Sequence, residues 1–455
     1  LIMKLSNKQI VIVGLGRTGL AVARFLHHRG ARIMATDTAD EAALGDTVAQ
    51  LRHMDIEIEL GAHSSRAFQE SDLIVVSPGV SHTIAPIAEA RSKGIKVVGE
   101  IELAARFIQA PIVAVTGTNG KTSVAGMLHS MLMELGEKSA LSGTIGFNLN
   151  GQLHQSANTT SDALTTQQMI ARAKEEGCSH MTMEVSSHGL VLGRLAGVEF
   201  KTAVFTNLTH DHLDFHGTME EYGHAKGLLF SQLGQDLQVK KQAVLNADDP
   251  WSKRYADMTS HPVFTYGVEM PAQFKAEAIE LGHSGTKFTL VCPLGEFDVS
   301  MKLLGSFNVS NALAAITALY AEGYPLEGVI AALSRIEPVE GRMQKVELEA
   351  PISIFIDYAH TPDAIEKAID AVADFKTNRI IFLVGTGGNR DKTKRPIMAE
   401  KASVADYVVL TTDDPREEAY DSILRDLQSG MKHQEFSCIG DRAEAVRHAI
   451  RQAEP

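Results

Sequence analysis

The chain has 455 residues, of which 44% are apolar and 22% charged, a composition typical of globular proteins of about two to four domains. Its 43 Lys and Arg residues against 56 Asp and Glu residues give a formal net charge of −13, which argues against a general nucleic-acid surface. No apolar run approaches the roughly 18 residues of a membrane span, and no signal-type segment opens the chain. We therefore expect a cytoplasmic protein without a membrane partner, in which Cys178, Cys292 and Cys438 are reduced and mostly buried.

Residues 8–100 alternate strand-like and helix-like segments. The expected strands are Gln9–Gly14, Ala31–Thr36, Asp72–Val76 and Ile95–Val98, and the expected helix is Thr18–His28. Gly14-Leu-Gly16-Arg-Thr-Gly19 matches G-x-G-x-x-G between the first strand and this helix, and Asp37 lies at the distance expected for a ribose-binding acid. The pattern predicts a nucleotide moiety, although a purely structural glycine turn has the same signature.

The next glycine-rich segment has the setting of a phosphate loop. A β-branched run, Ile112–Val115, leads into Gly117-Thr-Asn-Gly-Lys-Thr122, and a helical pattern follows over Val124–Met133. In such a loop, backbone N–H groups and Lys121 bind a polyphosphate, and the Thr122 hydroxyl reaches Mg²⁺. The sequence therefore predicts nucleotide binding here; an ordinary strand-to-helix turn is the alternative.

Further strands are predicted at His180–Val185, Thr202–Asn207, Gln242–Asn246 and Lys287–Val291, the last within an antiparallel extension over Lys275–Leu303. Glu184 follows an apolar strand, where a carboxylate is well placed to bind Mg²⁺; a helix cap is the alternative. Three His and two Asp residues crowd into residues 210–216. Their alternation does not fit zinc, but a metal or phosphate role is favoured for at least one His over a solvated loop. Lys226 lies in an amphipathic helix, where a surface lysine is the simplest interpretation.

The last third of the chain again alternates strands with helices. We expect strands at Ile352–Asp357, Ile380–Gly385 and Tyr407–Thr412 and helices at Pro362–Phe375 and Arg395–Val404, which predicts a parallel α/β unit. Four cations in six residues follow a glycine turn (Arg390, Lys392, Lys394 and Arg395). This pattern suits carboxylate or phosphate binding, with a solvated helix start as the alternative. Asp413-Asp414-Pro-Arg416 has mixed charges that suit a zwitterionic amino acid.

Taken together, these motifs resemble those of the Mur ligases, the ATP-dependent amide-bond ligases of bacterial peptidoglycan synthesis. Most of the chain resembles the MurE branch, which adds a diamino acid to UDP-MurNAc-L-Ala-D-Glu. The motifs that carry this resemblance are Thr116–Thr122, Asn158–Thr160, Glu184–His188, Thr206–His216, Asn308–Asn311, Gly341–Met343, Asp357–Asp363 and Gly388–Lys392. The N-terminal motifs Gly14–Gly19, Ser77–Gly79 and Gly99–Glu102 instead resemble the D-glutamate-adding MurD branch.

The resemblance implies an α/β, three-domain architecture. A Rossmann-like domain for the UDP-substrate would span residues 1–109, a P-loop ATP-binding domain 110–340, and a Rossmann-like amino-acid domain 341–455. The family's late Gly-Lys-Gly-His-Glu motif has no counterpart before Pro455, so the last domain is expected to be incomplete at its end.

The resemblance also implies roles for individual residues. The residues implied in catalysis are Lys121, Glu184, His212, Lys226 and Arg342. Those implied in ATP binding are Gly117, Thr118, Asn119, Gly120, Lys121, Thr122, Asn308, Asp357 and His360. Those implied in binding the UDP-substrate are Gly14, Leu15, Arg17, Thr18, Asp37, Thr38, Ser77, Asn158, Thr159, Thr160, Ser186 and Arg194, and those for the amino acid are Arg390, Asp413, Asp414 and Arg416. Two Mg²⁺ ions would be held by Thr122, Glu184, His212 and Lys226, with Lys226 carbamylated to N6-carboxylysine.

The implied reaction passes through an acyl phosphate, with a UDP-MurNAc-peptide and a free amino acid as substrates of a monomeric enzyme. Which diamino acid is added stays open, because Arg416 favours meso-diaminopimelate whereas Asp414 favours lysine. Two alternatives remain at this point. One is a Mur ligase that adds another amino acid, such as D-glutamate to UDP-MurNAc-L-Ala, and the other is a nucleotide-binding homologue without turnover.

Overall fold

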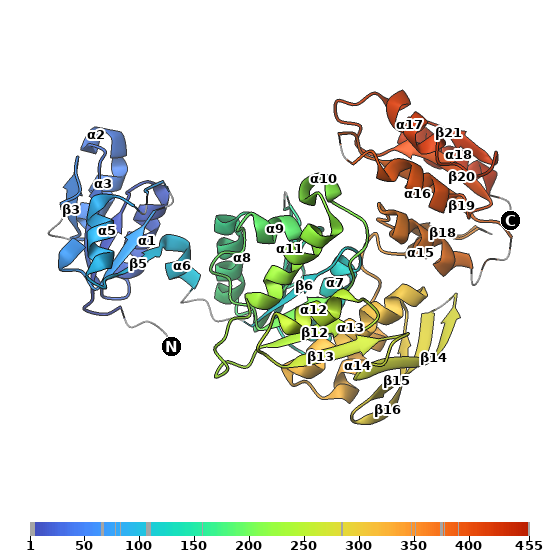
Figure 1. Cartoon of the computed structure of the whole chain (residues 1–455), viewed down its shortest axis with the longest axis horizontal. Coiled ribbons are helices and arrows are strands. Elements are labelled where there is room, and N and C mark those ends of the chain that lie inside the picture. Colours follow the sequence, from blue (N-terminus) through green and yellow to red (C-terminus); the bar gives the residue numbers. More distant parts are fainter. Residues whose placement is uncertain are drawn as a thin grey trace. The chain divides into compact units, whose positions relative to one another are not determined.

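The computed structural model describes residues 5–453 except 65–67, 78, 82, 106–110, 157, 284, 347, 351, 374–375, 377 and 390. The chain divides into two compact units. One comprises residues 1–109 with 162–171 and 195–198, and the other comprises the rest of the chain. Each unit contains its own sheets and its own cores (Figure 1).

The N-terminal unit contains a parallel sheet that is buried on both faces. Its strands run in the order β3-β2-β1-β4-β5. Along β1, Ile10 and Ile12 pack with Leu26 in one core, whereas Val11 and Val13 belong to a second core. Both faces of the strand are therefore apolar, as expected of a parallel sheet between two helical layers, and the predicted Rossmann-like fold is confirmed. The strands are β1 Gln9–Val13, β2 Arg32–Asp37, β3 Glu57–Leu60, β4 Leu73–Val76 and β5 Lys96–Gly99, and the helices are α1 Arg17–His27, α2 Glu41–Leu44, α3 Asp46–His53, α5 Ala85–Ser92 and α6 Glu100–Ala105.

The middle part of the chain forms an eleven-stranded sheet with a parallel centre. The strand order is β16-β15-β14-β13-β12-β11-β6-β10-β7-β8-β9, with antiparallel pairing at both ends. The predicted antiparallel extension over Lys275–Leu303 is confirmed by β14–β16, whereas the β7–β9 end was not predicted. The strands are β6 Ile112–Thr116, β7 Ser139–Gly143, β8 Gly146–Leu149, β9 Gln152–His154, β10 His180–Glu184, β11 Thr202–Phe205, β12 Gln242–Asn246, β13 Val263–Gly267, β14 Phe274–Gly282, β15 Gly285–Cys292 and β16 Gly295–Met301.

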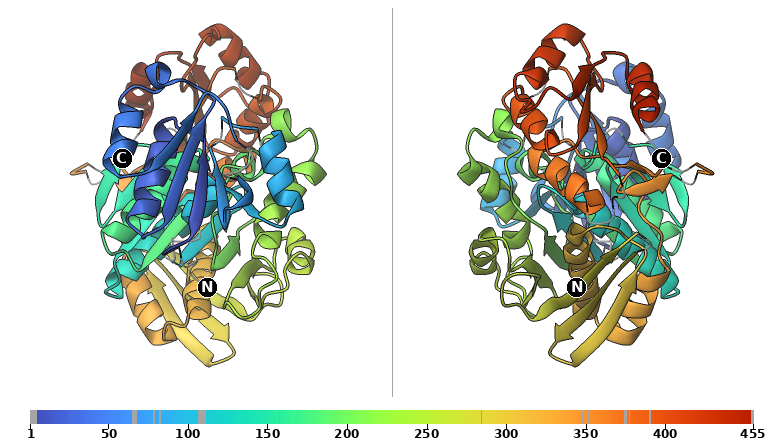
Figure 2. Two further views of the ribbon diagram at one scale, coloured as in Figure 1. Left: turned by 90° about the vertical axis from the view of Figure 1, so that its left-hand side faces the viewer. Right: turned by 90° about the vertical axis from the view of Figure 1, so that its right-hand side faces the viewer.

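The helices of this part place one large core against the sheet. Val113 and Val115 of β6 pack with apolar residues of α7, α13 and α14, and residues of β14–β16 belong to the same core. The yellow strands β14–β16 lie next to the orange helix α14 in Figure 2. This core anchors β6 and α7, and therefore the loop between them. The helices are α7 Lys121–Glu134, α8 Ala163–Glu175, α9 Ser187–Val191, α10 Leu213–His216, α11 Met219–Ser231, α12 Trp251–Asp257, α13 Ser306–Glu322 and α14 Leu326–Arg335.

The C-terminal part differs in one respect from the expected parallel sheet. The strand predicted at Ile352–Asp357 is β18, which pairs antiparallel with β17 and not with the parallel set β19-β20-β21. The cause lies in the preceding turn, since Asp357 accepts a hydrogen bond from the Met343 amide and Tyr358 donates to Gly341 O. The elements are β17 Gln344–Val346, β18 Ile354–Ile356, β19 Ile381–Thr386, β20 Tyr407–Thr412, β21 Phe436–Cys438, α15 Pro362–Ala373, α16 Lys394–Ala402, α17 Tyr420–Gln428 and α18 Arg442–Gln452.

The expectations about membrane spans and cysteines can be compared with the structure. No helix in the described part of the chain is long and apolar enough to cross a membrane. All three cysteines are free, but only Cys178 is buried, whereas Cys438 is exposed. The expectation of mostly buried thiols was therefore wrong.

Candidate active site at the phosphate loop

The loop between β6 and α7 is shaped by two glycines with positive φ. Gly117 has φ +154° and Gly120 has φ +82°. A Cβ at Gly117 would lie 1.8 Å from the Thr206 hydroxyl, so no larger residue fits there. The Lys121 ammonium donates to the carbonyls of Gly117 and Thr118, at 2.9 and 2.8 Å. Burial lowers the pKa of Lys121, while the charges of Glu184 and Asp211 oppose this effect. The loop thus holds a cation at a helix N-terminus, as polyphosphate binding requires.

Glu184 lies beside this loop at the end of β10. Its carboxylate accepts hydrogen bonds from the hydroxyl of Thr122 at 2.9 Å and from the amide of Thr144 at 2.8 Å. A Cβ at Gly143 would lie 2.1 Å from Glu184 Oε1, so the absence of a side chain there makes room for the carboxylate. The predicted pair of Thr122 and Glu184 is brought together. The contributions of Gly143 and Thr144 were missed, because nothing in their local sequence distinguishes them.

Lys226 on α11 is buried and lies at the same loop. Its ammonium donates to Gly117 O at 2.7 Å and lies 4.4 Å from the centre of the Tyr222 ring. Burial, followed by repulsion from Lys121, holds the pKa of Lys226 well below its usual value. The interpretation of Lys226 as a surface lysine was therefore wrong, since only 1% of the residue is exposed.

The histidine-rich segment forms a packed aromatic cluster next to these residues. The ring of His188 lies 4.9 Å from that of His212 and 5.5 Å from that of His216, whose Nε2 is 2.9 Å from the Ser187 hydroxyl. Burial lowers the pKa of His212 to about 3, although Asp211 opposes this shift. The imidazole is consequently neutral near pH 7, the form in which histidine binds a metal.

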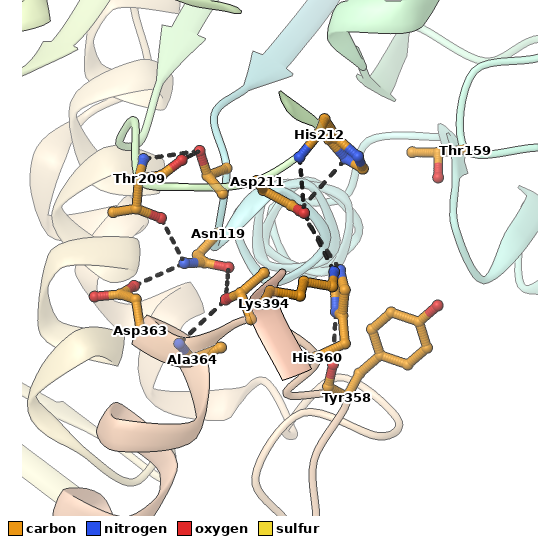
Figure 3. Close-up of polar contacts among 12 residues, drawn as sticks. Asn119, Thr159, Thr209, Asp211, His212, Tyr358, His360, Asp363, Ala364 and Lys394 are labelled. Atoms are coloured by element: carbon orange, nitrogen blue, oxygen red, sulfur yellow. Dashed lines mark hydrogen bonds and ion pairs between the residues drawn. The ribbon is translucent and has the colours of Figure 1, made fainter. Parts of the chain in front are cut away.

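Asp211 connects this cluster with the C-terminal domain, by which we mean the part that contains β17–β21 and α15–α18, as Figure 3 shows. Its carboxylate lies 3.4 Å from His212 Nε2, 3.3 Å from Lys394 Nζ and 3.9 Å from His360 Nε2. Burial would raise the pKa of Asp211, but the charges of His212 and Lys394 lower it to about 2. No role was predicted for Asp211 itself, and Lys394 was predicted only as part of a cation-rich loop for oxyanions.

A second group of contacts joins the phosphate loop to the same domain (Figure 3). Asn119 Nδ2 donates to Asp363 at 2.7 Å, and its Oδ1 accepts from the Thr361 hydroxyl at 3.3 Å. Arg342 donates to the Thr122 hydroxyl at 2.9 Å and stacks over the Tyr358 ring. The predicted residue Arg342 therefore lies at the phosphate loop, whereas His360 lies beside Asp211.

The predicted ATP-binding residues Asn308 and Asp357 form hydrogen bonds with backbone groups. Asn308 is buried and donates to Leu304 O at 2.8 Å. Asp357 accepts from the Met343 amide at 2.8 Å, and burial raises its pKa despite that bond and the nearby Arg342 charge.

The residues predicted to bind the UDP-substrate fall into two sets. In the N-terminal unit, Asp37 accepts from the Leu15 amide at 2.6 Å, and Ser77 donates to Gly14 O at 3.0 Å. Thr18 lies in the first turn of α1, Thr38 directly follows β2, and the side chain of Arg17 lies outside the described part. In the other unit, Thr160 donates to Glu184 O at 3.0 Å and accepts from the Ser186 amide, while Arg194 donates to Thr160 O. Asn158 is exposed, and the Thr159 hydroxyl is 3.0 Å from that of Thr144.

The cation-rich loop after β19 differs from the expected oxyanion site. Arg390 lies outside the described residues. Lys392 and Arg395 pair with Glu418, and Lys394 pairs with Asp211, so these three cations already have carboxylate partners. A pocket of about 510 Å³ lies beside the loop and is lined by Leu213, Asp214, Asn389, Asp391, Lys392 and Thr393.

The predicted amino-acid residues after β20 are exposed at a neighbouring turn. Asp413 pairs with Arg442 at 2.5 Å, and Arg416, with φ +52°, has its Nε 3.6 Å from Asp414. The opposite charges of Asp414 and Arg416 are thus partly compensated by each other.

Comparisons with known proteins agree with this arrangement. Three family models match successive segments: the Mur ligase MurD-like N-terminal domain over residues 8–99, the Mur ligase middle domain over 115–319, and the Mur ligase glutamate ligase domain over 341–455. The first match confirms the MurD-like character of the N-terminal segment.

Individual relatives give the same result. The chain is 49% identical over 341 residues to the UDP-N-acetylmuramoyl-L-alanyl-D-glutamate–L-lysine ligase of Staphylococcus aureus, covering 75% of this chain and 69% of that protein. It is 47% identical over 347 residues to the Staphylococcus haemolyticus protein of the same name, covering 76% and 70%. A solved UDP-N-acetylmuramoyl-L-alanyl-D-glutamate–2,6-diaminopimelate ligase superimposes with a TM-score of 0.58 and 29% identity over 86% of each chain. The chain belongs to the Mur ligase family.

Proposed function

We propose that the protein is an ATP-dependent amide-bond ligase that adds a diamino acid to UDP-MurNAc-L-Ala-D-Glu. The observation that carries this proposal is the convergence of Lys121, the Thr122–Glu184 pair and buried Lys226 on one glycine loop. The relatives near 48% identity carry the corresponding L-lysine ligase name, which supports the same assignment.

The proposed reaction has two steps. The side-chain carboxylate of the substrate D-Glu attacks the γ-phosphorus of ATP, the bond to the bridging oxygen breaks, and ADP leaves. The amine of the amino acid then attacks the acyl phosphate, and inorganic phosphate departs as the amide forms. Lys121 and Arg342 are placed to stabilise the negative charge on the transferring group, since both lie at the loop.

The donor set beside the loop fits Mg²⁺, provided that Lys226 is modified. Thr122 and Glu184 would supply oxygen ligands for one ion, and Glu184, His212 and Lys226 would hold a second. Among the described residues, no three His, Cys, Asp or Glu side chains can form a metal site by themselves. An unmodified ammonium at Lys226 would repel a cation, whereas N6-carboxylysine supplies an anionic oxygen. Bound Mg²⁺ would supply positive charge to the triphosphate and to the group being transferred.

The state of Lys226 favours this modification. Carbon dioxide reacts with the neutral amine, and burial, followed by repulsion from Lys121, lowers the pKa of Lys226, which favours the neutral form. The carbamate would also remove the repulsion between buried Lys226 and the neighbouring Lys121.

We propose L-lysine as the amino acid that is added. The distal carboxylate of meso-diaminopimelate would need a free cation, but Asp414 lies close to the Arg416 guanidinium. The same aspartate suits a distal ammonium, and the named relatives are L-lysine ligases. Arg390, Asp413, Asp414 and Arg416 remain the proposed amino-acid residues, and residues 1–109, 110–340 and 341–455 the proposed UDP-substrate, ATP and amino-acid domains.

A direct test is phosphate release with ATP, UDP-MurNAc-L-Ala-D-Glu and a panel of amino acids. Release with L-lysine that exceeds release with meso-diaminopimelate would support the full proposal. Preference for meso-diaminopimelate would refute only the lysine assignment. Release confined to UDP-MurNAc-L-Ala with D-glutamate would refute the diamino-acid ligase, and no release with any pair would favour a homologue without turnover.

A further inference from the structure

Two loops of the C-terminal domain leave neighbouring strands at the same edge of the sheet. β19 and β20 are parallel, with Thr386 opposite Thr412 in the register. Residues 387–393, of which the structure describes all but residue 390, follow the first strand, and residues 413–419 follow the second. In open α/β sheets, ligands bind at the carboxyl ends of the strands. The relative placement of these loops therefore bears on any ligand bound there.

The two loops make close backbone contact. The Gly388 amide donates to Asp414 O at 2.8 Å. A Cβ at Gly388 would lie 1.9 Å from Pro415 O, so the loops approach as closely as glycine permits. Moving one loop away from the other by about 1 Å would break this hydrogen bond.

Glu418 is the centre of the polar contacts between the same loops. Its Oε2 accepts from the Asn389 amide at 3.0 Å and from Arg395 at 2.8 Å, and its Oε1 accepts from the other Arg395 nitrogen at 2.9 Å. Lys392 and Ser422 also donate to Oε1, at 2.9 and 3.2 Å. One carboxylate on the second loop therefore fixes a backbone amide and a lysine of the first loop.

Arg395 holds this carboxylate from the first turn of α16. Its side chain is fully buried, and that of Glu418 is 7% exposed. The guanidinium also donates to Gly387 O at 3.2 Å and to Asp426 at 2.8 Å. Hydrogen bonds from Arg395, Lys392 and the Asn389 amide hold the pKa of Glu418 well below its usual range. Because a bidentate arginine–carboxylate pair fixes both distance and orientation, the pair defines the spacing of the two loops.

We propose that Glu418 and Arg395 are positioning residues that set the affinity for the amino acid by holding these two loops together. The inference rests on the proposed function, because it takes the loops as the amino-acid site. Neither side chain contacts the amino acid in this account. The Glu418 carboxylate and the two terminal nitrogens of Arg395 are engaged with each other, with the loop backbone, and with Lys392, Ser422 and Asp426, whereas the buried Arg395 Nε has no hydrogen-bond partner among the described residues.

The test compares two substitutions around the same arginine. Glu418→Gln keeps the size of the side chain but places an amide NH₂ against the guanidinium, which breaks the bidentate pair. Asp426→Asn is the matched control, because Asp426 pairs with Arg395 without contacting either loop. A misplacement of about 1 Å can lower activity by about a hundredfold. For the more limited loosening caused by E418Q we expect the KM for the amino acid to rise about tenfold. The KM values for ATP and UDP-MurNAc-peptide should stay within about twofold of the wild-type values, and D426N should resemble the wild type in all three.

A second measurement does not depend on turnover. Hydrogen exchange of the amides in residues 387–393 should accelerate about tenfold in E418Q and not in D426N, since the Asn389 amide loses its carboxylate acceptor. If E418Q does not fold, Arg395→Lys, which retains the cation but not its fork, should show both effects in weaker form. A proportional rise of all three KM values, or equal effects of E418Q and D426N, would overturn the positioning role in an active enzyme. If wild-type protein shows no ligase activity, the proposed function fails, and unchanged exchange in E418Q would then also refute the loop contact.

Discussion

The contact between Lys394 and Asp211 predicts how strongly the C-terminal domain is coupled to the phosphate loop. We consider Lys394→Met, which keeps the length of the side chain and removes the charge. The two side chains are only 12% and 4% exposed, and their charged atoms are 3.3 Å apart. Because Lys394 belongs to α16 and Asp211 follows β11, the substitution weakens an ion pair between the two domains and not a pair within one.

The size of the effect follows from this geometry. At an effective dielectric constant of about 20, two unit charges at this distance attract by about 5 kcal/mol. Desolvation of the buried pair offsets much of that energy, and His212 and His360 stay beside Asp211 in the variant. A net coupling of about 2 kcal/mol remains, which corresponds to a change of about 30-fold in the equilibrium between joined and separated domains.

Steady-state kinetics can measure this coupling. The apparent affinity for a ligand falls in proportion to the population that can bind it. Since both domains contribute proposed ATP residues, K394M should weaken the apparent affinities for ATP and for the amino acid together, each by up to about 30-fold. Lys401→Met is the matched control, because Lys401 is on the same helix but pairs with Glu366 of its own domain. If K394M were indistinguishable from K401M in both KM values, the coupling inferred from the contact would be refuted.

Three other changes give separate tests. Gly143→Ala should lower kcat at least tenfold with little loss of folded protein, because the new methyl group must displace the Glu184 carboxylate; normal phosphate release would contradict this reasoning. His129 is buried, and burial lowers its pKa from 6.5 to about 4. Between about pH 6.5 and pH 4, His129 is therefore protonated in the unfolded chain but neutral in the folded one. The free energy of unfolding should fall by about 3 kcal/mol as the pH drops through this window, and it should level off below about pH 4. Urea unfolding of H129Q should lack this component, and identical pH profiles would exclude it. For Lys226, NMR with isotopically labelled bicarbonate should detect a carbamate that is absent from K226A, and activity should fall when dissolved carbon dioxide is removed; a fully active enzyme in its absence would count against the modification.

Much of the fold could be predicted from local sequence, because its strands are buried on both faces. The centres of β1, β6, β10 and β12 are apolar or β-branched, with polar residues mainly at the strand ends, and the glycines after β1 and β6 mark sharp turns. The β17–β18 pair could not be predicted in this way. Its pairing depends on hydrogen bonds from the turn at Gly341–Met343, and these are invisible to periodicity.

Some residues of the site could likewise be predicted from a local motif, whereas others depend on contacts with distant segments. Lys121 and Thr122 could be located from the glycine loop alone. The buried position of Lys226 could not be predicted from local sequence, because its ammonium bonds to the Gly117 carbonyl, 109 positions away in the chain. The four cations after β19 gave a misleading local signal, since Glu418 and Asp211, which neutralise three of them, come from other segments.

The MurD-like and MurE-like motifs of the chain are compatible, because they belong to different units. The MurD-like segment is confined to the N-terminal unit, which has its own sheet and two cores of its own. Every residue proposed to choose the amino acid follows β19 or β20 of the other unit. Under the proposed assignment, the MurD-like segment at residues 8–99 contributes none of the residues that choose the amino acid. The proposed choice depends on the charges of Asp414 and Arg416, because the aspartate suits a distal ammonium whereas the arginine suits a distal carboxylate.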